Sequence, residues 1–317
     1  MFLTLLVSVV CIFLMMVPGA LAFRRAWLNN HSLQGLSRIN VYVLYPCLIF
    51  SVIVSNFTFS SLLRSWYLPA ISFGIMLIGY IGGLIACSLF KIHSRETHKS
   101  FLFQSAINNY SFFPLALVIT LFGSEGTGIL IFSTLGAELA VWTLGMFILS
   151  GHSFRLKSLL HLLSPPMMGL YLAVLFLAVC RFFQFDPGFL SDKGTPANSL
   201  FNAVTMLSGA VVPISMIIAG ARISKIKLAE VMNRLVWLLS VLRLVIVPLA
   251  AVFIISFLPI DALSKKIMMI VAVMPVSLSS MLLSEIYGGD KEFIDGTVLL
   301  THLLSMLTAP AILAFLI

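Results

Sequence analysis

Residues 101–121 read FLFQSAINNYSFFPLALVITL, an apolar run that is interrupted by a polar cluster and a proline. About 20 apolar residues in a helix cross the hydrocarbon core of a bilayer, and this run has that length. Within it, Asn108, Asn109 and Ser111 are polar groups that are expensive to bury in lipid. Pro114 lacks the N–H that closes a helical turn. We therefore expect a membrane span that is broken near its centre, where protein or a water-filled cavity satisfies the freed backbone groups.

A second stretch near the end of the chain repeats this combination. Residues 273–281 read VMPVSLSSM, with a proline followed by three serines. Two interrupted polar helices in matching positions are the best indication that a sequence gives of a transporter's substrate site. The alternative is that each proline only kinks an ordinary span, with serines that bond back to the helix. On the first interpretation, the substrate-binding residues are Asn108, Asn109, Ser111, Pro114, Pro275, Ser277, Ser279 and Ser280.

The rest of the chain has the composition of a membrane protein. Of its 317 residues, 60% are apolar and 9% are charged, whereas about 25% of the residues in soluble domains are charged. The expected fold is an all-α integral membrane protein without a soluble domain, and no nucleotide-binding P-loop is present to drive pumping. Arg24 and Arg25 follow the first apolar run, which we interpret as a retained span and not as a cleaved signal. The ten expected spans are 2–23, 36–56, 67–90, 101–121, 128–150, 164–183, 199–219, 234–257, 266–286 and 294–316.

Lys and Arg are distributed unevenly over the connections between these spans. Connections after odd-numbered spans carry 13 of the 19, the others carry five, and Arg243 lies within the eighth span. Because cytoplasmic loops are enriched in Lys and Arg, both termini are expected on the extracytoplasmic side of a plasma or inner membrane. The net charge of +8 then reflects topology, and nucleic-acid binding is not expected. The four cysteines lie in apolar runs without a CxxC or a histidine partner, which predicts neither a metal site nor a disulfide.

Weak internal similarity indicates that the chain consists of two halves. A shift of 165 residues aligns FGSE at 122–125 with YGGD at 287–290, and Thr143 with Thr308, while a shift of 167 pairs Pro46 with Pro213. With five spans in each half, the second half would be inserted upside down, a common plan of secondary transporters. We expect repeats at 1–150 and 164–317. The connection 151–163 would join them, with an interfacial helix between Arg155 and Leu163.

Three ionisable side chains lie inside the expected spans. Glu138 either relays a proton or pairs with Arg243, and the sequence leaves both open. His302 either titrates near neutral pH or is a neutral packing residue. These three are the candidates for coupling transport to H⁺ or Na⁺. Gly79 and Gly83 form a G-x-x-x-G motif, which predicts close packing of helices.

The charge of the expected site favours an anion. Half-helices that begin at a break direct the partial positive charge of their N-termini toward it. No Asp or Glu lies beside either break. We therefore expect the site to bind a carboxylate in preference to a cation.

Several stretches together resemble the auxin efflux carrier family of permeases. They are NYSFFPLA at 109–116, LFGSEG at 121–126, WTLG at 142–145, MPV at 274–276 and IYGGD at 286–290, with RR at 24–25, LSR at 36–38 and YPCLIF at 45–50. The resemblance implies two inverted five-helix repeats, broken fourth and ninth helices that cross at the substrate site, and organic-anion substrates such as auxin or malonate. Two positions depart from the family pattern, since a family proline falls at Ala116 and a family asparagine at Ser279. The large hydrophilic loop of the plant carriers is missing, so auxin itself is not the expected substrate.

The expected function is therefore alternating-access transport of small organic anions, with no enzymatic activity and no cofactor. The bilayer and the substrate are the expected partners, and the sequence leaves open whether the carrier works as a homodimer. A different kind of carrier, a sodium-coupled symporter resembling the bile acid carriers, would need a cluster of acidic and backbone ligands for the ion. Outside transport, a membrane sensor would need an output domain, and an intramembrane enzyme would need a catalytic dyad or zinc ligands.

Overall fold

The computed structural model describes residues 2–150, 160, 162–227 and 232–316. In these residues the chain is helical and contains no β-strand, which confirms the prediction of an all-α membrane protein. Short π-helical segments at Asn40–Leu44, Val141–Gly145 and Leu242–Ile246 continue the helices beside them, and Pro187–Ser191 is a 3₁₀ turn. The helices are α1 (Phe2–Arg24), α2 (Asn30–Ile39), α3 (Tyr45–Asn56), α4 (Phe59–Arg64), α5 (Tyr67–Leu89), α6 (Arg95–Ala106), α7 (Phe112–Ala140), α8 (Met146–Leu149), α9 (Pro165–Phe182), α10 (Pro196–Gly209), α11 (Val211–Ile223), α13 (Arg234–Val241), α14 (Val247–Ser256), α15 (Ala262–Ala272), α16 (Ser279–Tyr287) and α17 (Lys291–Ala314).

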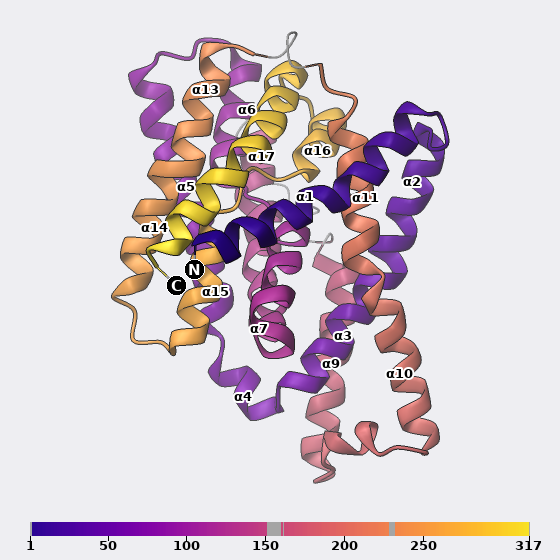
Figure 1. Cartoon of the computed structure of the whole chain (residues 1–317). Coiled ribbons are helices and arrows are strands. Elements are labelled where there is room, and N and C mark those ends of the chain that lie inside the picture. Colours follow the sequence, from indigo (N-terminus) through magenta and orange to yellow (C-terminus); the bar gives the residue numbers. More distant parts are fainter. Residues whose placement is uncertain (1, 151–159, 161, 228–231, 317) are drawn as a thin grey trace.

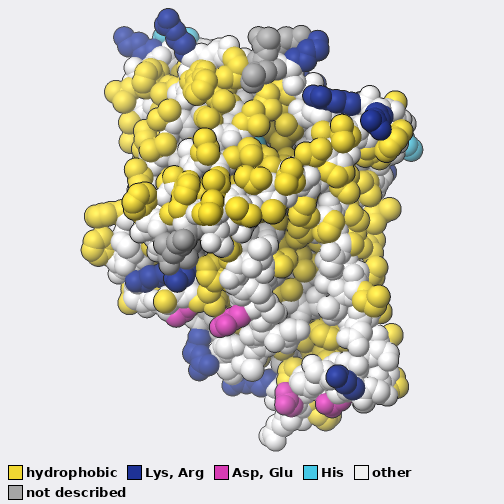
Figure 2. Space-filling view, in the orientation of Figure 1, with side chains coloured by type: hydrophobic (Ala, Val, Ile, Leu, Met, Phe, Trp, Pro, Cys, Tyr) yellow, Lys and Arg dark blue, Asp and Glu magenta, His cyan; other side chains and the backbone are white. Residues whose placement is uncertain are grey.

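Eight helical stretches in the described residues are long and apolar enough to cross a membrane. The first half of the expected fourth span and the whole of the expected ninth span are missing from these eight, because both spans are interrupted. The total of ten spans therefore stays a prediction. Figure 2 shows a broad hydrophobic band between an upper edge with Lys and Arg and a lower part with both acidic and basic side chains, the pattern of a lipid-facing surface.

The junction between the expected fourth and fifth spans is sharper than the sequence indicated. Two helical segments that share the label α7 meet at Gly123, whose backbone is not helical, and Gly123 lies within the expected connection 122–127. Gly123 has φ +58° and ψ −146°, a backbone conformation that side chains other than glycine strongly disfavour. A single glycine therefore redirects the chain between the two spans.

The helices pack in pairs that bring distant parts of the chain together (Figure 1). Helix α1 packs along α11, α3 along α9, α17 against α1 and α13, and α15 against α7 and α14. Helix α5 packs against both α6 and α7. A Cβ atom at Gly79 would overlap the backbone carbonyl of Ser105, and one at Gly83 would overlap the Ser105 side chain. The prediction of close helix packing at this G-x-x-x-G motif is confirmed, because it lets α5 lie against the end of α6.

Polar caps fix where several helices begin. The Asn29 side chain accepts from the Ser32 backbone at the start of α2, and Asp261 does the same for Ser264 at α15. Asp290 accepts from the Phe293 N–H at the start of α17, and its second carboxylate oxygen accepts from the Thr97 hydroxyl of α6 at 2.6 Å. Residues 151–159 and 161 of the expected inter-repeat connection, including most of its interfacial helix, lie outside the described residues.

Candidate functional site

Two helical breaks lie where the sequence predicted them, with one difference in position. Helix α6 ends at Ala106 and α7 begins at Phe112, while α15 ends at Ala272 and α16 begins at Ser279. Pro275 lies within its break, but Pro114 is the third residue of α7 and follows its break. The reason is that the first N–H groups of a helix have no partner in the helix, so a proline starts a helix there without loss. Pro114 thus lies in the first turn of the second half-helix.

The two breaks cross and bind each other through their backbones. The Asn109 N–H donates to the Pro275 carbonyl at 2.8 Å, and the Ser277 N–H donates to the Ile107 carbonyl at 3.2 Å. This forms an isolated antiparallel bridge centred on Asn108 and Val276. Backbone groups freed at membrane depth need partners, and here each break supplies them to the other.

Arg243 satisfies further backbone groups at the crossing. Its side chain is fully buried, and it comes from the π-helical segment Leu242–Ile246, just before the proline at position 248. Nε donates to the Met274 carbonyl at 3.2 Å, Nη2 to the Ala272 carbonyl at 3.1 Å and Nη1 to the Ser105 carbonyl at 3.4 Å. All three acceptors lie at the end of α6, at the end of α15 or in the second break. Arg243 therefore joins both broken spans to the eighth.

The two asparagines of the first break differ in how they are bound. Asn108 is fully buried and donates Nδ2 to the Val271 carbonyl at 2.6 Å, while its Oδ1 has no hydrogen-bond partner among the described residues. Asn109 is 5% exposed, and its Nδ2 lies 3.3 Å from Nε2 of His302. Asn108 thus holds an unused acceptor at the crossing, a group that a ligand or a water molecule would complete.

His302 is held in one neutral tautomer by its neighbours. Its Nδ1 lies 2.8 Å from the Val298 carbonyl, which can only accept, so Nδ1 carries the hydrogen. Nε2 then accepts from the amide of Asn109. The ring also packs edge-on against Phe113, with centroids 5.9 Å apart. This arrangement favours the packing interpretation of His302 and links α17 to the first break.

The serines of the second break bond to one another at the start of α16, whereas Ser111 bonds to another span. The hydroxyls of Ser277 and Ser279 lie 2.7 Å apart, and the Ser280 hydroxyl donates to the Ser277 carbonyl at 2.6 Å. Ser111 does not cap α7, because its hydroxyl lies 2.7 Å from the hydroxyl of Tyr45 in α3. Of these serines, Ser111 and Ser279 are only partly buried and are the most accessible to a ligand.

Glu138 does not pair with Arg243 in the part of the chain that the structure describes. Its two carboxylate oxygens accept from the Tyr110 hydroxyl at 2.9 Å and from the Trp142 indole N–H at 3.0 Å. Tyr110 follows Asn109 directly in the chain. The interhelical ion pair considered from the sequence is therefore replaced by a hydrogen-bonded carboxyl next to the first break.

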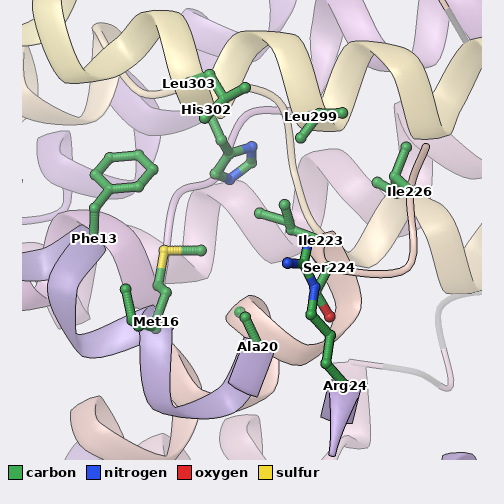
Figure 3. A pocket seen from close by; sticks show the side chains of 12 residues that line it. Phe13, Met16, Ala20, Arg24, Ile223, Ser224, Ile226, Leu299, His302 and Leu303 are labelled. Carbon is green, nitrogen blue, oxygen red and sulfur yellow. The ribbon is translucent and has the colours of Figure 1, made fainter. Parts of the chain in front are cut away.

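A cavity of about 330 Å³ lies between α1, α11 and α17. Its walls are mainly apolar, and its ionisable lining groups are Arg24 and His302. Figure 3 shows Met16 and Phe13 of α1 on the side that faces His302, and Arg24 extending toward Ile223 and Ser224. One of its lining residues, His302, contacts the Asn109 side chain of the first break. The cavity thus extends from Arg24 to His302, the side chain that contacts Asn109.

Four contributors to this site were missed by reasoning from the sequence. Tyr45, Tyr110 and Trp142 are aromatic residues in apolar runs, which look like ordinary packing residues until their partners are known. Arg24 was interpreted as a marker of topology only. The nearest available signal is that Tyr110 lies between two candidate polar residues in the first break.

Comparison with known proteins gives matches over nearly the whole chain. A family model described as Membrane transport protein matches residues 4–313. An uncharacterized transporter of Methanocaldococcus jannaschii is 25% identical over 288 residues, which cover 88% of each chain. Another, from Methanothermobacter thermautotrophicus, is 25% identical over 288 residues, or 89% of each chain.

Proposed function

Because the chain belongs to the membrane transport protein family, we propose that it carries small organic anions across the bilayer by alternating access, with the substrate bound at the crossing. The family includes the auxin efflux carriers, so the resemblance expected from the sequence is confirmed. The chain is a multi-pass membrane transporter. The substrate class, the site and the transport cycle are the proposal.

The observation that carries this proposal is the reciprocal pairing of the two breaks. The bonds from Asn109 to Pro275 and from Ser277 to Ile107 hold the two non-helical stretches of backbone against each other. Unwound backbone at membrane depth is typical of a transporter's substrate site. The N-termini of α7 and α16 begin at the crossing, and helix N-termini bind anions. Asn109 and Ser279 are the polar side chains best suited to hold a carboxylate there.

Two features support inverted repeats at 1–150 and 164–317. Gly123 and Gly288, which the 165-residue shift aligns, both have positive φ, at +58° and +80°. The packing is also reciprocal. Helix α1, the first expected span of the first half, packs along α11, which lies in the second expected span of the second half. Conversely, α3, in the second expected span of the first half, packs along α9, the first expected span of the second half. When two such halves rock against each other, a central site opens alternately to the two sides of the membrane.

The proposed orientation makes the cavity a cytoplasmic entrance. We place the chain in a plasma or inner membrane with both termini outside, because Lys and Arg are concentrated on the opposite side. Arg24 then lies on the cytoplasmic side and has no hydrogen-bond partner or ion pair among the described residues. A carboxylate that enters this cavity meets a cation first.

We propose proton coupling at Glu138 in preference to sodium coupling. Glu138 is an acid that touches two hydrogen-bond donors and no cation in the described residues, and Tyr110 connects it to the first break.

Flux into proteoliposomes tests the proposed function. The purified chain is reconstituted, and uptake of labelled malonate, succinate, lactate and phenylacetate is measured with and without imposed proton and sodium gradients. We expect saturable uptake of at least one of these carboxylates. Rates equal to those of protein-free liposomes for all four, with the protein shown to be folded and inserted, would refute the anion-carrier proposal.

A further inference from the structure

Arg243 occupies a place in the crossing that transport of an anion does not by itself explain. It is fully buried, and its three described partners are backbone carbonyls. No Asp or Glu side chain contacts it within the described residues. A buried charge without a countercharge is expensive, so its surroundings must supply negative potential.

Two helix ends supply that potential. Ser105 lies in the last turn of α6, and Ala272 is the last residue of α15. The C-terminus of a helix carries roughly half a negative charge, because its last carbonyls have no partner in the helix. Arg243 donates to one carbonyl at each of these ends. Its single positive charge therefore offsets about two half-charges.

The other two helix ends at the crossing have the opposite sign. Helices α7 and α16 begin there with their N-termini, each of which carries roughly half a positive charge. Without Arg243, the four helix ends would sum to about zero, and the crossing would have no preference for an anion. With Arg243, the four helix ends and the guanidinium sum to about one positive charge, which one carboxylate neutralises while Glu138 next to the first break carries a proton.

We propose that Arg243 is the residue that sets the charge selectivity of the substrate site. It cancels the negative ends of α6 and α15, so that the positive ends of α7 and α16 are left to bind a single carboxylate. Arg243 acts through the backbone and does not touch the substrate. This inference rests on the proposed function, because it concerns the site at the crossing.

The chain offers a conservative variant and a matched control. Arg243→Lys keeps the positive charge but cannot reach three carbonyls with a planar fork, while Arg243→Gln removes the charge. Arg234→Gln removes an exposed arginine at the start of the same span. Arg234→Gln therefore measures the effect of losing one positive charge anywhere on the protein, and Arg243→Gln measures the effect of losing the buried charge at the crossing.

The measurement is carboxylate affinity against the affinity of an uncharged analogue. For each carboxylate that the wild type takes up from the set malonate, lactate and phenylacetate, KM is measured, together with the inhibition constant of its amide. Arg243→Gln should raise the KM of the carboxylate about tenfold, which corresponds to about 1.4 kcal/mol, and change the amide constant less than about twofold. Arg243→Lys and Arg234→Gln should both keep KM within about threefold.

Several outcomes would overturn the inference. Equal weakening of carboxylate and amide by Arg243→Gln, or a loss of maximal rate with unchanged KM, would mean that Arg243 only supports the fold. If Arg243→Gln does not yield folded protein, a tenfold rise of KM in Arg243→Lys would contradict a role of the charge, whereas an unchanged KM would support it. Absence of carboxylate uptake by the wild type would instead refute the proposed function itself.

Discussion

The backbone N–H of Asn109 donates to the carbonyl of Pro275 at 2.8 Å, although 166 positions separate the two residues. Each residue lies in the interruption of a different membrane helix. The bond therefore connects the break in the expected fourth span to the break in the expected ninth span. Movement of one break changes the environment of the other, which a carrier needs when it exposes one site alternately to two sides.

We predict that Glu138→Gln abolishes proton coupling and leaves the structure around residue 138 intact. The glutamine amide can accept from the Trp142 indole and donate to the Tyr110 hydroxyl, so both contacts of Glu138 are kept. Carboxylate uptake without a pH gradient should persist, and its stimulation by an imposed pH gradient should disappear. Unchanged stimulation in proteoliposomes that contain the folded variant would exclude Glu138 as the coupling site.

Close packing of α5 on α6 predicts a local loss of stability in Gly79→Ala. The added Cβ overlaps the Ser105 carbonyl, and overpacking of this kind costs about 1–3 kcal/mol. Gly74→Ala is the matched control in the same helix, because no atom lies within 4 Å of a Cβ at Gly74. Thermal unfolding in detergent should show a lower midpoint for Gly79→Ala alone. Equal midpoints for the two variants would contradict the described contact.

We predict that Asp261, in the loop before α15, contributes to the stability of the fold in a pH-dependent way. Partial burial raises the pKa of the Asp261 carboxyl, but hydrogen bonds from Ser264 and Tyr67 outweigh burial and hold the pKa below its usual value. A lowered folded pKa means that this stabilisation is present above the unfolded pKa, about 3.9, and is lost as the pH falls through the folded pKa.

Asp261→Asn should therefore melt at a lower temperature than the wild type at pH 7, with a difference that narrows below about pH 4. The matched control is Asp192→Asn, because Asp192 is exposed and its side chain makes no hydrogen bond in the described residues. A difference between Asp261→Asn and the wild type that does not vary with pH would contradict this explanation.

The proposed orientation predicts which connections are accessible from outside. In a background without the four native cysteines, Lys193→Cys and Arg95→Cys place single thiols at exposed positions in connections of opposite predicted sides. A maleimide that cannot cross membranes should label Lys193→Cys in intact cells and Arg95→Cys only after permeabilisation. The reverse pattern would mean that the chain is inserted with its termini inside.

Much of the fold follows from local signals in the sequence. Long apolar runs predict spans because lipid offers no partner to the backbone, and Gly79 and Gly83 predict close packing because they lack side chains. The break near Asn108 and Asn109 is also visible as a polar cluster. Its position was less accurate, because a proline marks either the end of one helix or the start of the next.

The partners of buried polar groups could not be predicted from the sequence. Arg243 and Glu138 were considered as a pair because they are opposite charges inside expected spans. In the described structure Arg243 binds backbone carbonyls that become available only when two remote helices end beside it. That juxtaposition depends on how the spans pack, which local patterns do not specify. The same holds for Tyr45, which reaches Ser111 from another span.

Transport by Asn109→Ala and Ser279→Ala tests the central claim most directly. Both side chains lie in or next to the crossing, whereas Asn202→Ala changes an exposed asparagine of α10 and is the control. With equal amounts of folded protein in the liposomes, we predict that the first two variants reduce carboxylate uptake at limiting concentration about tenfold or more and that the control does not. Wild-type uptake by both variants would contradict a substrate site at the crossing.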